Sequence, residues 1–265
     1  MAETLHVFAG PGPEIRRIEI DRPWAWLSAG WNDMLAAPRI SLACGALVAV
    51  ASVALAATLL VVDLPWLLLP MAAGFFLVAP LVAVGLYETS RRLEAGERPT
   101  LAGALGAVRR HLGPLANLGV VLMLLHLLWV RVATLLFALF FDGAHPGWGT
   151  IIDTVFFSPA SLPFLATGCL VGFMLACAAF AIGAVSIPML LDRDAGVFAA
   201  IVTSIAAVRL NWRPMALWAA LIVVFIAAGM ATFFLGLAVA MPLIGHATWH
   251  AYRETIDAGA WPPRE

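Results

Sequence analysis

Five long apolar runs constrain the possible folds of this chain more than any other feature of its sequence. The runs are Ile40 to Val62, Trp66 to Tyr87, Leu115 to Phe141, Pro163 to Leu191 and Pro214 to Trp249. A helix needs about 20 apolar residues to cross the hydrocarbon core of a bilayer. The first four runs each suit one crossing, and the 36 residues of the last suit two helices with a tight turn near Gly229 to Thr232. We therefore predict an all-α, polytopic membrane bundle of about six transmembrane helices.

The composition supports a bilayer as the solvent of this chain. Hydrophobic residues make up 63% of the sequence and charged residues 12%, with a mean hydropathy of +0.96, whereas a soluble domain is roughly half apolar and a quarter charged. The net charge of −1 argues against a nucleic-acid partner. All 15 basic residues are Arg, which with the excess of Ala and Gly is typical of a GC-rich bacterial genome. The cysteines Cys44, Cys169 and Cys177 lie inside apolar runs without paired spacing, so we expect small buried side chains and no disulfide.

An internal repeat relates two parts of the chain. The stretch from Ala95 to Ala116, AGERPTLAGALGAVRRHLGPLA, recurs without a gap from Ala195 to Ala216, and seven of the 22 aligned positions are identical. In both copies the apolar residues are spaced by four, three and four, which indicates one stripe of an amphipathic helix. Each helix leads to a Pro that opens a long apolar run. The segment from Trp24 to Ala37, before Pro38, is a candidate degenerate third copy.

These patterns predict the domain organisation and the orientation. We expect a six-helix membrane domain over residues 24–252, built of three hairpin repeats at about 24–90, 95–191 and 195–252, each preceded by an amphipathic helix. Residues 1–23, which carry no signal-peptide pattern, and residues 253–265 are expected to be tails. The loops on one side hold every Arg except Arg131, so the positive-inside rule places both termini and the amphipathic helices in the cytoplasm of a bacterial inner membrane. The amphipathic helices would lie in the headgroup plane.

The third apolar run carries two ionisable residues, His126 and Arg131. Ionisable groups inside a membrane are candidates for function. Arg131, however, lies close to the outer end of its run, where it can reach the interface and pair with Asp142 or Asp153. For His126, a hydrogen bond to a neighbouring helix is the commoner role.

A pair of histidines near the end of the last run suggests a metal or haem site. His246 and His250 are four residues apart, so both imidazoles lie on one face of a helix. Two ligands make a weak site, and Glu88 or Asp192 would have to provide a third.

Interpretations without ligand chemistry compete with these sites. Trp249 and Tyr252 beside the histidine pair are typical of an aromatic belt at the headgroups. Glu88, which is followed by Arg91 and Arg92, is typical of a salt-bridged helix terminus.

The motifs of most enzyme classes are missing from the sequence. We find no Gly-rich phosphate loop after a strand, no Ser or Cys nucleophile with a paired base, and no carboxylate pair in the middle of a predicted span. We therefore expect neither an enzyme nor a cofactor.

Several segments together resemble one family. The segments are GFFLVAPLVAVGLYETSRRLEAGE, IPMLLDRD, TSIAAVRLNWRPM and PLIGHATWHAYR. They are similar to the bacterial integral membrane proteins grouped as domain of unknown function 2189, over roughly residues 20–255. The resemblance implies a polytopic inner-membrane protein, mostly of proteobacteria, and brings no established activity and no catalytic residue.

Two functions remain as hypotheses. The first is a non-catalytic accessory, assembly or scaffolding subunit, whose partners are the lipid bilayer and other membrane subunits. Its helices would pack through small residues spaced by four, such as Gly168, Gly172 and Ala176.

The alternative is a small-solute or lipid transporter. The internal repeats favour it, as do prolines that can break helices around a site at the middle of the membrane. These prolines are Pro80, Pro188 and Pro242.

Overall fold

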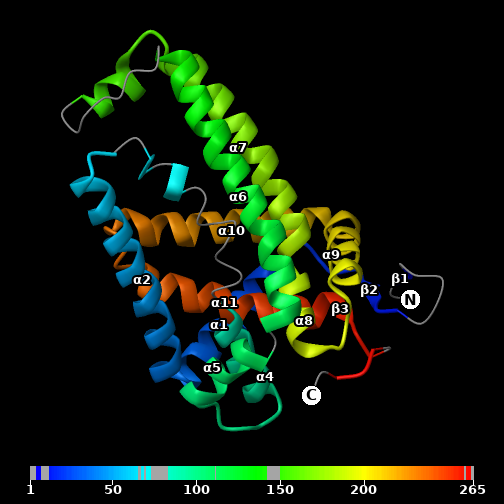
Figure 1. Ribbon diagram of the computed structural model, residues 1–265. Coiled ribbons are helices and arrows are strands. Elements are labelled where there is room, and N and C mark those ends of the chain that lie inside the picture. The colour runs from blue at the N-terminus through cyan, green and yellow to red at the C-terminus, as the bar shows by residue number, and fades with distance from the viewer. Residues whose placement is uncertain are drawn as a thin grey trace. The chain divides into compact units, whose positions relative to one another are not determined.

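The computed structural model describes residues 4–6, 12–64, 67–68, 70–72, 83–110, 112–141, 150–259 and 261–263. These residues are mostly helical and form two compact units (Figure 1). Unit 1 comprises Met1–Val50, Pro80–Leu118 and Phe180–Glu265, and unit 2 comprises Ala51–Ala79 and Gly119–Ala179. This division cuts across the three hairpin segments expected from the sequence.

Four helical stretches among the described residues are long and apolar enough to cross a membrane. They are α2 (Pro38–Val61), α6 (Leu112–Phe140), the stretch Ser161–Asp192 formed by α7 (Ser161–Gly183) and α8 (Ser186–Asp192), and α10 (Trp212–Ala231). Each coincides with an apolar run of the sequence, as expected for a helical membrane bundle. The prediction of a second span between Trp66 and Tyr87 falls mostly outside the described residues.

The last apolar run contains two helices. After α10 the chain turns through Phe233 and Phe234, both with positive φ, and continues as α11 (Leu237–Thr255). Only α10 of this pair is among the four candidate spans. α11 is less apolar because its second half carries His, Trp, Tyr, Arg and Glu residues, and these residues build most of the polar contacts described below.

Unit 1 is organised around α11. The helices α1 (Arg22–Ala36), α4 (Val84–Glu94) and α10 pack on it, and Figure 1 shows α10 and α11 running side by side. Two glycines allow the closest approaches: a Cβ at Gly30 would lie 2.6 Å from the backbone nitrogen of Ala247, and a Cβ at Gly45 would lie 2.1 Å from the carbonyl oxygen of Ala238. Any larger residue would separate these helices, since backbone atoms cannot move aside as a flexible side chain can.

A small antiparallel sheet joins the two ends of the described chain. Its strands are β1 (Thr4–His6), β2 (Glu14–Arg16) and β3 (Ile256–Asp257), in that order. Ile15 on β2 is fully buried. The sequence predicts tails for both segments, whereas in the structure they pair with each other. Strands of two or three residues are too short to produce a recognisable alternation of polar and apolar residues.

Asn211 fixes the segment after β2. Its amide oxygen accepts a hydrogen bond from the backbone N–H of Ile18 at 3.0 Å, and its amide nitrogen donates one to the carbonyl of Arg16 at 2.9 Å. Asn211 lies between α9 (Val197–Leu210) and α10, so the break between these helices also holds the N-terminal segment.

Unit 2 is held together mainly by aromatic contacts. α6 and α7 run alongside each other (Figure 1), and the ring of Phe164 on α7 packs against Phe137 and Phe141 on α6, with centroid distances of 5.9 and 5.0 Å. A short π-helix, η2 (Asp153–Phe157), adds Val155 to the same cluster. Few residues of α6 are buried inside the protein, and its exposed leucines, among them Leu124, Leu127 and Leu139, can contact lipid.

Candidate functional site

The second half of α11 carries polar side chains that interact with several other helices of unit 1. Six side chains near its C-terminal end contact residues of other elements: His246, Trp249, His250, Tyr252, Arg253 and Glu254. Buried polar groups are costly unless they are hydrogen-bonded. These contacts therefore specify how the helices of unit 1 pack.

His246 links three helices through its imidazole. Nε2 lies 2.9 Å from the hydroxyl of Ser41 on α2, and Nδ1 lies 2.8 Å from the hydroxyl of Ser90 on α4. Ser41 donates its own proton to the carbonyl of Ala37 at 2.9 Å, so it accepts from Nε2–H. Ser90 then donates to Nδ1. The geometry thus fits a neutral imidazole that carries its proton on Nε2, with both nitrogens engaged.

His250, one turn further along α11, contacts a different partner. Its Nε2 lies 2.8 Å from the carboxylate of Asp33 on α1. Glu254, on the next turn, accepts hydrogen bonds from the guanidinium of Arg22 and the indole of Trp26. One face of α11 is therefore bound to α1 by two carboxylate contacts in addition to the close approach at Gly30.

Glu88 on α4 is a buried carboxylate that contacts several arginines. Its side chain is only 2% exposed, and its oxygens lie 2.7 Å from Nε of Arg91 and 2.7 Å from Nε of Arg92. Arg110 approaches it at 3.7 Å. Burial alone would raise the pKa of Glu88, but the hydrogen bonds and charges of Arg91 and Arg92 outweigh it and hold the pKa below its ordinary value. Glu88 is therefore ionised and stabilises the end of α4.

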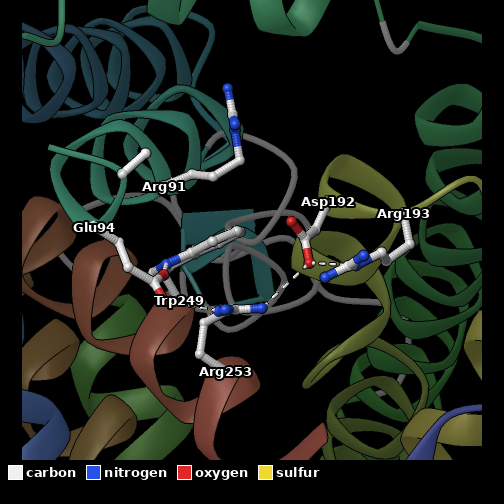
Figure 2. A pocket seen from close by; sticks show the side chains of 7 residues that line it. Arg91, Glu94, Asp192, Arg193, Trp249 and Arg253 are labelled. Carbon is white, nitrogen blue, oxygen red and sulfur yellow. Dashed lines mark hydrogen bonds and ion pairs between the residues drawn. The ribbon is translucent and has the colours of Figure 1, made fainter. Parts of the chain in front are cut away.

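An open pocket of about 270 Å³ lies beside these residues (Figure 2). Its lining side chains are Arg91, Glu94, Ala95, Asp192, Arg193, Trp249 and Arg253. They come from the ends of α4, α8 and α11, all within unit 1. The lining carries three positive and two negative charges, and Trp249 provides an aromatic wall.

Asp192 is the centre of the pocket's ion pairs. Its Oδ2 accepts hydrogen bonds from Nε of Arg193 at 3.0 Å and from the hydroxyl of Tyr252 at 2.8 Å, and Nη1 of Arg253 lies 3.6 Å away. Figure 2 shows Arg193 and Arg253 reaching Asp192 from different sides, with the guanidinium of Arg91 pointing away from it.

Glu94 holds the other side of the pocket. One carboxylate oxygen accepts from Nε of Arg253 at 3.0 Å, and the other accepts from the indole N–H of Trp249 at 2.9 Å.

The structure separates the residues that the metal hypothesis would bring together. His246 contacts two serines and His250 contacts Asp33, and within the described ranges no three His, Cys, Asp or Glu side chains lie together in a group that can hold a metal ion. Glu88 is paired with arginines, and Asp192 lies in the pocket. The geometry favours a hydrogen-bonding role for both histidines over ligation.

The aromatic-belt interpretation of the same segment is wrong. Trp249 is 1% exposed and Tyr252 is 0% exposed. Their polar atoms contact Glu94 and Asp192, and their rings lie 5.5 Å apart. Both rings are inside the protein, because the carboxylates of α4 and α8 provide the hydrogen-bond partners that lipid headgroups would otherwise supply.

A comparison with known protein families finds a match for the part of the chain that includes α4 to α8. Residues 67–192 match the DUF2189 family. The family is described as a predicted integral membrane protein, and the match spans just under half of the chain. It confirms the expected resemblance for this segment. No curated protein and no solved structure matches the chain.

The DUF2189 segment contains Glu88, Arg91 and Asp192 of the candidate site, whereas His246 and His250 lie outside it. It also contains His126 and Arg131, both on α6. Nδ1 of His126 is buried without a hydrogen-bond partner among the described residues. Arg131 is exposed. Of its two expected partners, Asp142 lies outside the described residues, and no ion pair with Asp153 is found in the part of the chain that the structure describes.

Four residues of the site are not predicted by the sequence: Asp33, Ser41, Ser90 and Glu94. None belongs to a motif, and the pairs they form with α11 join residues at least 155 positions apart. One signal was available. In a chain with so few charged residues, each carboxylate flanked by apolar sequence requires a partner.

Proposed function

We propose that this chain is a non-catalytic component of the bacterial inner membrane that acts as an accessory, assembly or scaffolding subunit. In this proposal it crosses the membrane six times, with both termini in the cytoplasm, and three amphipathic helices lie in the headgroup plane. These helices are α1, α5 (Leu101–Arg110) and α9. The main support for the proposal is that the large apolar side chains of these three helices point outward.

In α1 the outward face is apolar and the inward face is closely packed. Trp24, Trp31 and Leu35 are 56%, 45% and 59% exposed. Trp26 and Gly30 on the opposite face are buried. A soluble protein would gain by burying the first three side chains, whereas a helix lying on a bilayer places them in the acyl region.

The same pattern occurs in α5 and α9. In α5, Leu101 and Leu105 are exposed, whereas Ala104 is buried. In α9, Phe198 is exposed and Ala200 is buried. Small residues therefore face the protein and large apolar residues face outward, which supports contact with lipid along all three helices.

Two of these helices lead into a candidate span after a single residue. α1 ends at Ala36 before α2 begins at Pro38, and α9 ends at Leu210 before Trp212. A helix in the membrane plane that turns directly into a spanning helix requires such a break. This shared arrangement supports a repeated structural unit, while the junction between α5 and α6 lies outside the described residues.

The surface of α7 supports the scaffolding role. Gly168 has no heavy atom within 4 Å of the position of a Cβ, whereas the corresponding position at Gly172 faces the ring of Trp129 at 3.0 Å. Ala176 is exposed. Gly172 thus serves packing within unit 2, while Gly168 and Ala176, one turn to either side of it, remain open for close contact with another transmembrane helix.

Affinity purification from native membranes in mild detergent tests the scaffolding role. We expect a membrane partner at constant stoichiometry with the unmodified chain. Gly168→Leu should lower its recovery, and the matched control Gly113→Leu, at a position that is also open, should leave recovery unchanged. Recovery of the chain alone at every detergent strength would contradict the proposal.

Reporter fusions test the proposed topology. Fusions after Gly96 and Gly196, and one after Glu265, should report the cytoplasm, and a fusion after Gly147 should report the outside. A fusion after Glu265 that reports the outside would mean that α11 does not cross the membrane as a sixth span.

A small-solute or lipid transporter is the second candidate, and the charged pocket of unit 1 favours it. The prolines provide less support, because α11 continues through Pro242 as one helix, while Pro188 lies in the first turn of α8 directly after a break. Lipid exchange between vesicles that contain the purified chain would favour transport, and exchange at the rate of protein-free vesicles would exclude it for the lipids used.

A further inference from the structure

We propose that the pocket lined by Arg193, Arg253 and Trp249 binds the headgroup of a phospholipid: a phosphodiester whose head carries an N–H or O–H donor. This inference goes beyond a scaffolding role. The depth of the pocket in the membrane rests on the proposed topology, since Ala95 adjoins Gly96 and Arg193 lies three residues before Gly196, the two glycines chosen for cytoplasmic reporters.

The guanidinium groups supply unused donors for a phosphate. Each Arg has five N–H donors. Arg253 uses Nε for Glu94 and directs Nη1 to Asp192, and Arg193 uses Nε for Asp192 and Nη1 for the carbonyl of Trp261 at 3.1 Å. Nη2 of both residues has no protein partner among the described residues. Planar Arg donors match the geometry of phosphate oxygens.

The carboxylates define the rest of the ligand. The lining carries three Arg against Glu94 and Asp192. Arg91 is already paired with Glu88, so Arg193 and Arg253 face two carboxylates, and a multiply charged anion is a poor match. Asp192 uses Oδ2 for its contacts, and Oδ1 has no partner among the described residues. This oxygen suits an ammonium or hydroxyl donor. A choline head offers no such donor and is excluded by this chemistry.

The size and position of the pocket agree with a lipid headgroup. A volume of about 270 Å³ lies below the range of about 300–1,000 Å³ that encloses whole drug-sized ligands. It can hold a phosphate and a short head while the acyl chains stay outside. Chains outside the pocket would lie in the bilayer if the nearby α5 and α9 lie in the headgroup plane.

Thermal unfolding of the purified full chain in detergent tests the inference. Short-chain phosphatidylethanolamine, phosphatidylglycerol and phosphatidylcholine, and inorganic phosphate, are added separately. We expect the first two lipids to raise the unfolding temperature in a saturable manner, with little effect of the other two additions. Equal stabilisation by phosphatidylcholine would overturn the donor requirement and with it the proposal, as would equal stabilisation by inorganic phosphate at the same concentration.

Substitutions test whether the stabilising lipid binds in the pocket. Arg193→Gln combined with Arg253→Gln should weaken apparent binding at least about tenfold, or 1.4 kcal/mol. The matched control, Arg209→Gln with Arg213→Gln, removes the same charge from exposed positions and should change binding less than about twofold. Equal losses in the two double variants would overturn the proposal, because they would indicate nonspecific attraction.

Arg193→Lys combined with Arg253→Lys keeps the test available if the Gln variant does not fold. It preserves the charge but replaces each planar guanidinium with an ammonium group, so lipid binding should still fall by about three- to tenfold. Unchanged binding would overturn the proposed geometry. The topology reporters fail or succeed independently of these measurements, so loss of the lipid effect with correct topology refutes only the binding site.

Discussion

α11 in unit 1 and α6 in unit 2 differ in whether their polar side chains have hydrogen-bonding partners. α11 is buried along nearly its whole length, and six of its polar side chains have partners on other elements. α6 is longer and has few buried residues, and its two ionisable residues, His126 and Arg131, have no partner among the described residues. Specific packing thus comes from paired polar groups in one unit and from aromatic and aliphatic surfaces in the other.

The largest effect is expected where backbones touch. Gly45→Ala places a methyl group 2.1 Å from the carbonyl oxygen of Ala238, so α2 and α11 must move apart. We expect a loss of about 3 kcal/mol or more in the free energy of unfolding. The control Gly168→Ala, in the open position on α7, should be neutral or stabilising by up to about 1 kcal/mol through helix propensity. Unfolding in graded denaturing detergent measures both, and equal stability would contradict the packing described for unit 1.

One substitution made in both units tests the comparison directly. His246→Leu removes the partner of Ser90 and should cost about 2–4 kcal/mol, because buried polar groups are left unsatisfied. His126→Leu removes an imidazole whose Nδ1 has no partner, so it should be neutral or slightly stabilising. Thermal unfolding of the two variants in the same detergent gives the difference.

A double variant identifies the source of the loss at His246. Adding Ser90→Ala to His246→Leu should recover part of the stability, since it removes the unsatisfied hydroxyl. Strictly additive losses would show that the Ser90 to His246 hydrogen bond contributes little.

Glu88→Gln is expected to have an intermediate effect. It removes a buried charge that pairs with Arg91 and Arg92, at a cost of about 2 kcal/mol near neutral pH because the arginines remain partly solvated. The pKa of Glu88 is lower in the folded state than its ordinary value of 4.5. Its contribution is therefore complete above the ordinary value and is lost as the pH falls through the lowered one. Unfolding curves of both proteins should converge in acid, and a difference that grows below pH 4.5 would contradict this sign.

The smallest effect is expected at the sheet between the two ends of the described chain. Asp257 pairs with Arg16, and both side chains are nearly half exposed. The backbone N–H of Gly259 and the guanidinium of Arg16 lower the pKa of Asp257. Asp257→Asn should cost less than about 1 kcal/mol, and the loss should disappear in high salt, which screens exposed pairs. A salt-independent loss of several kcal/mol would show that the sheet is a principal stabilising element.

Much of the helical architecture follows from the sequence. The apolar runs predicted the positions of α2, α6, α7 and α10, because length and composition alone decide whether a helix can span a bilayer. The turn in the last run was predicted near Gly229 to Thr232, and α10 ends at Ala231.

The site was much harder to predict. Polar residues at the end of an apolar run are typical of a membrane boundary, so the sequence favoured an interfacial role for Trp249 and Tyr252. Their burial depends on Glu94 and Asp192, which are 155 and 60 residues away. Local periodicity contains no information about such distant pairs. It correctly grouped Glu88 with Arg91 and Arg92, which lie within one turn of a helix.

The contacts of α11 also impose an order of events during biosynthesis. Asp33, Ser41, Ser90 and Asp192 all leave the ribosome before α11 does, and their partners on α11 are His250, His246 and Tyr252. Until α11 arrives, these polar groups have to be shielded by water, by the insertion machinery or by lipid headgroups. Unit 2 contains no residue of α11, so its aromatic cluster can form while translation continues. Chains interrupted before Leu237 would thus carry a packed unit 2 and an incomplete unit 1 whose polar groups lack their partners on α11.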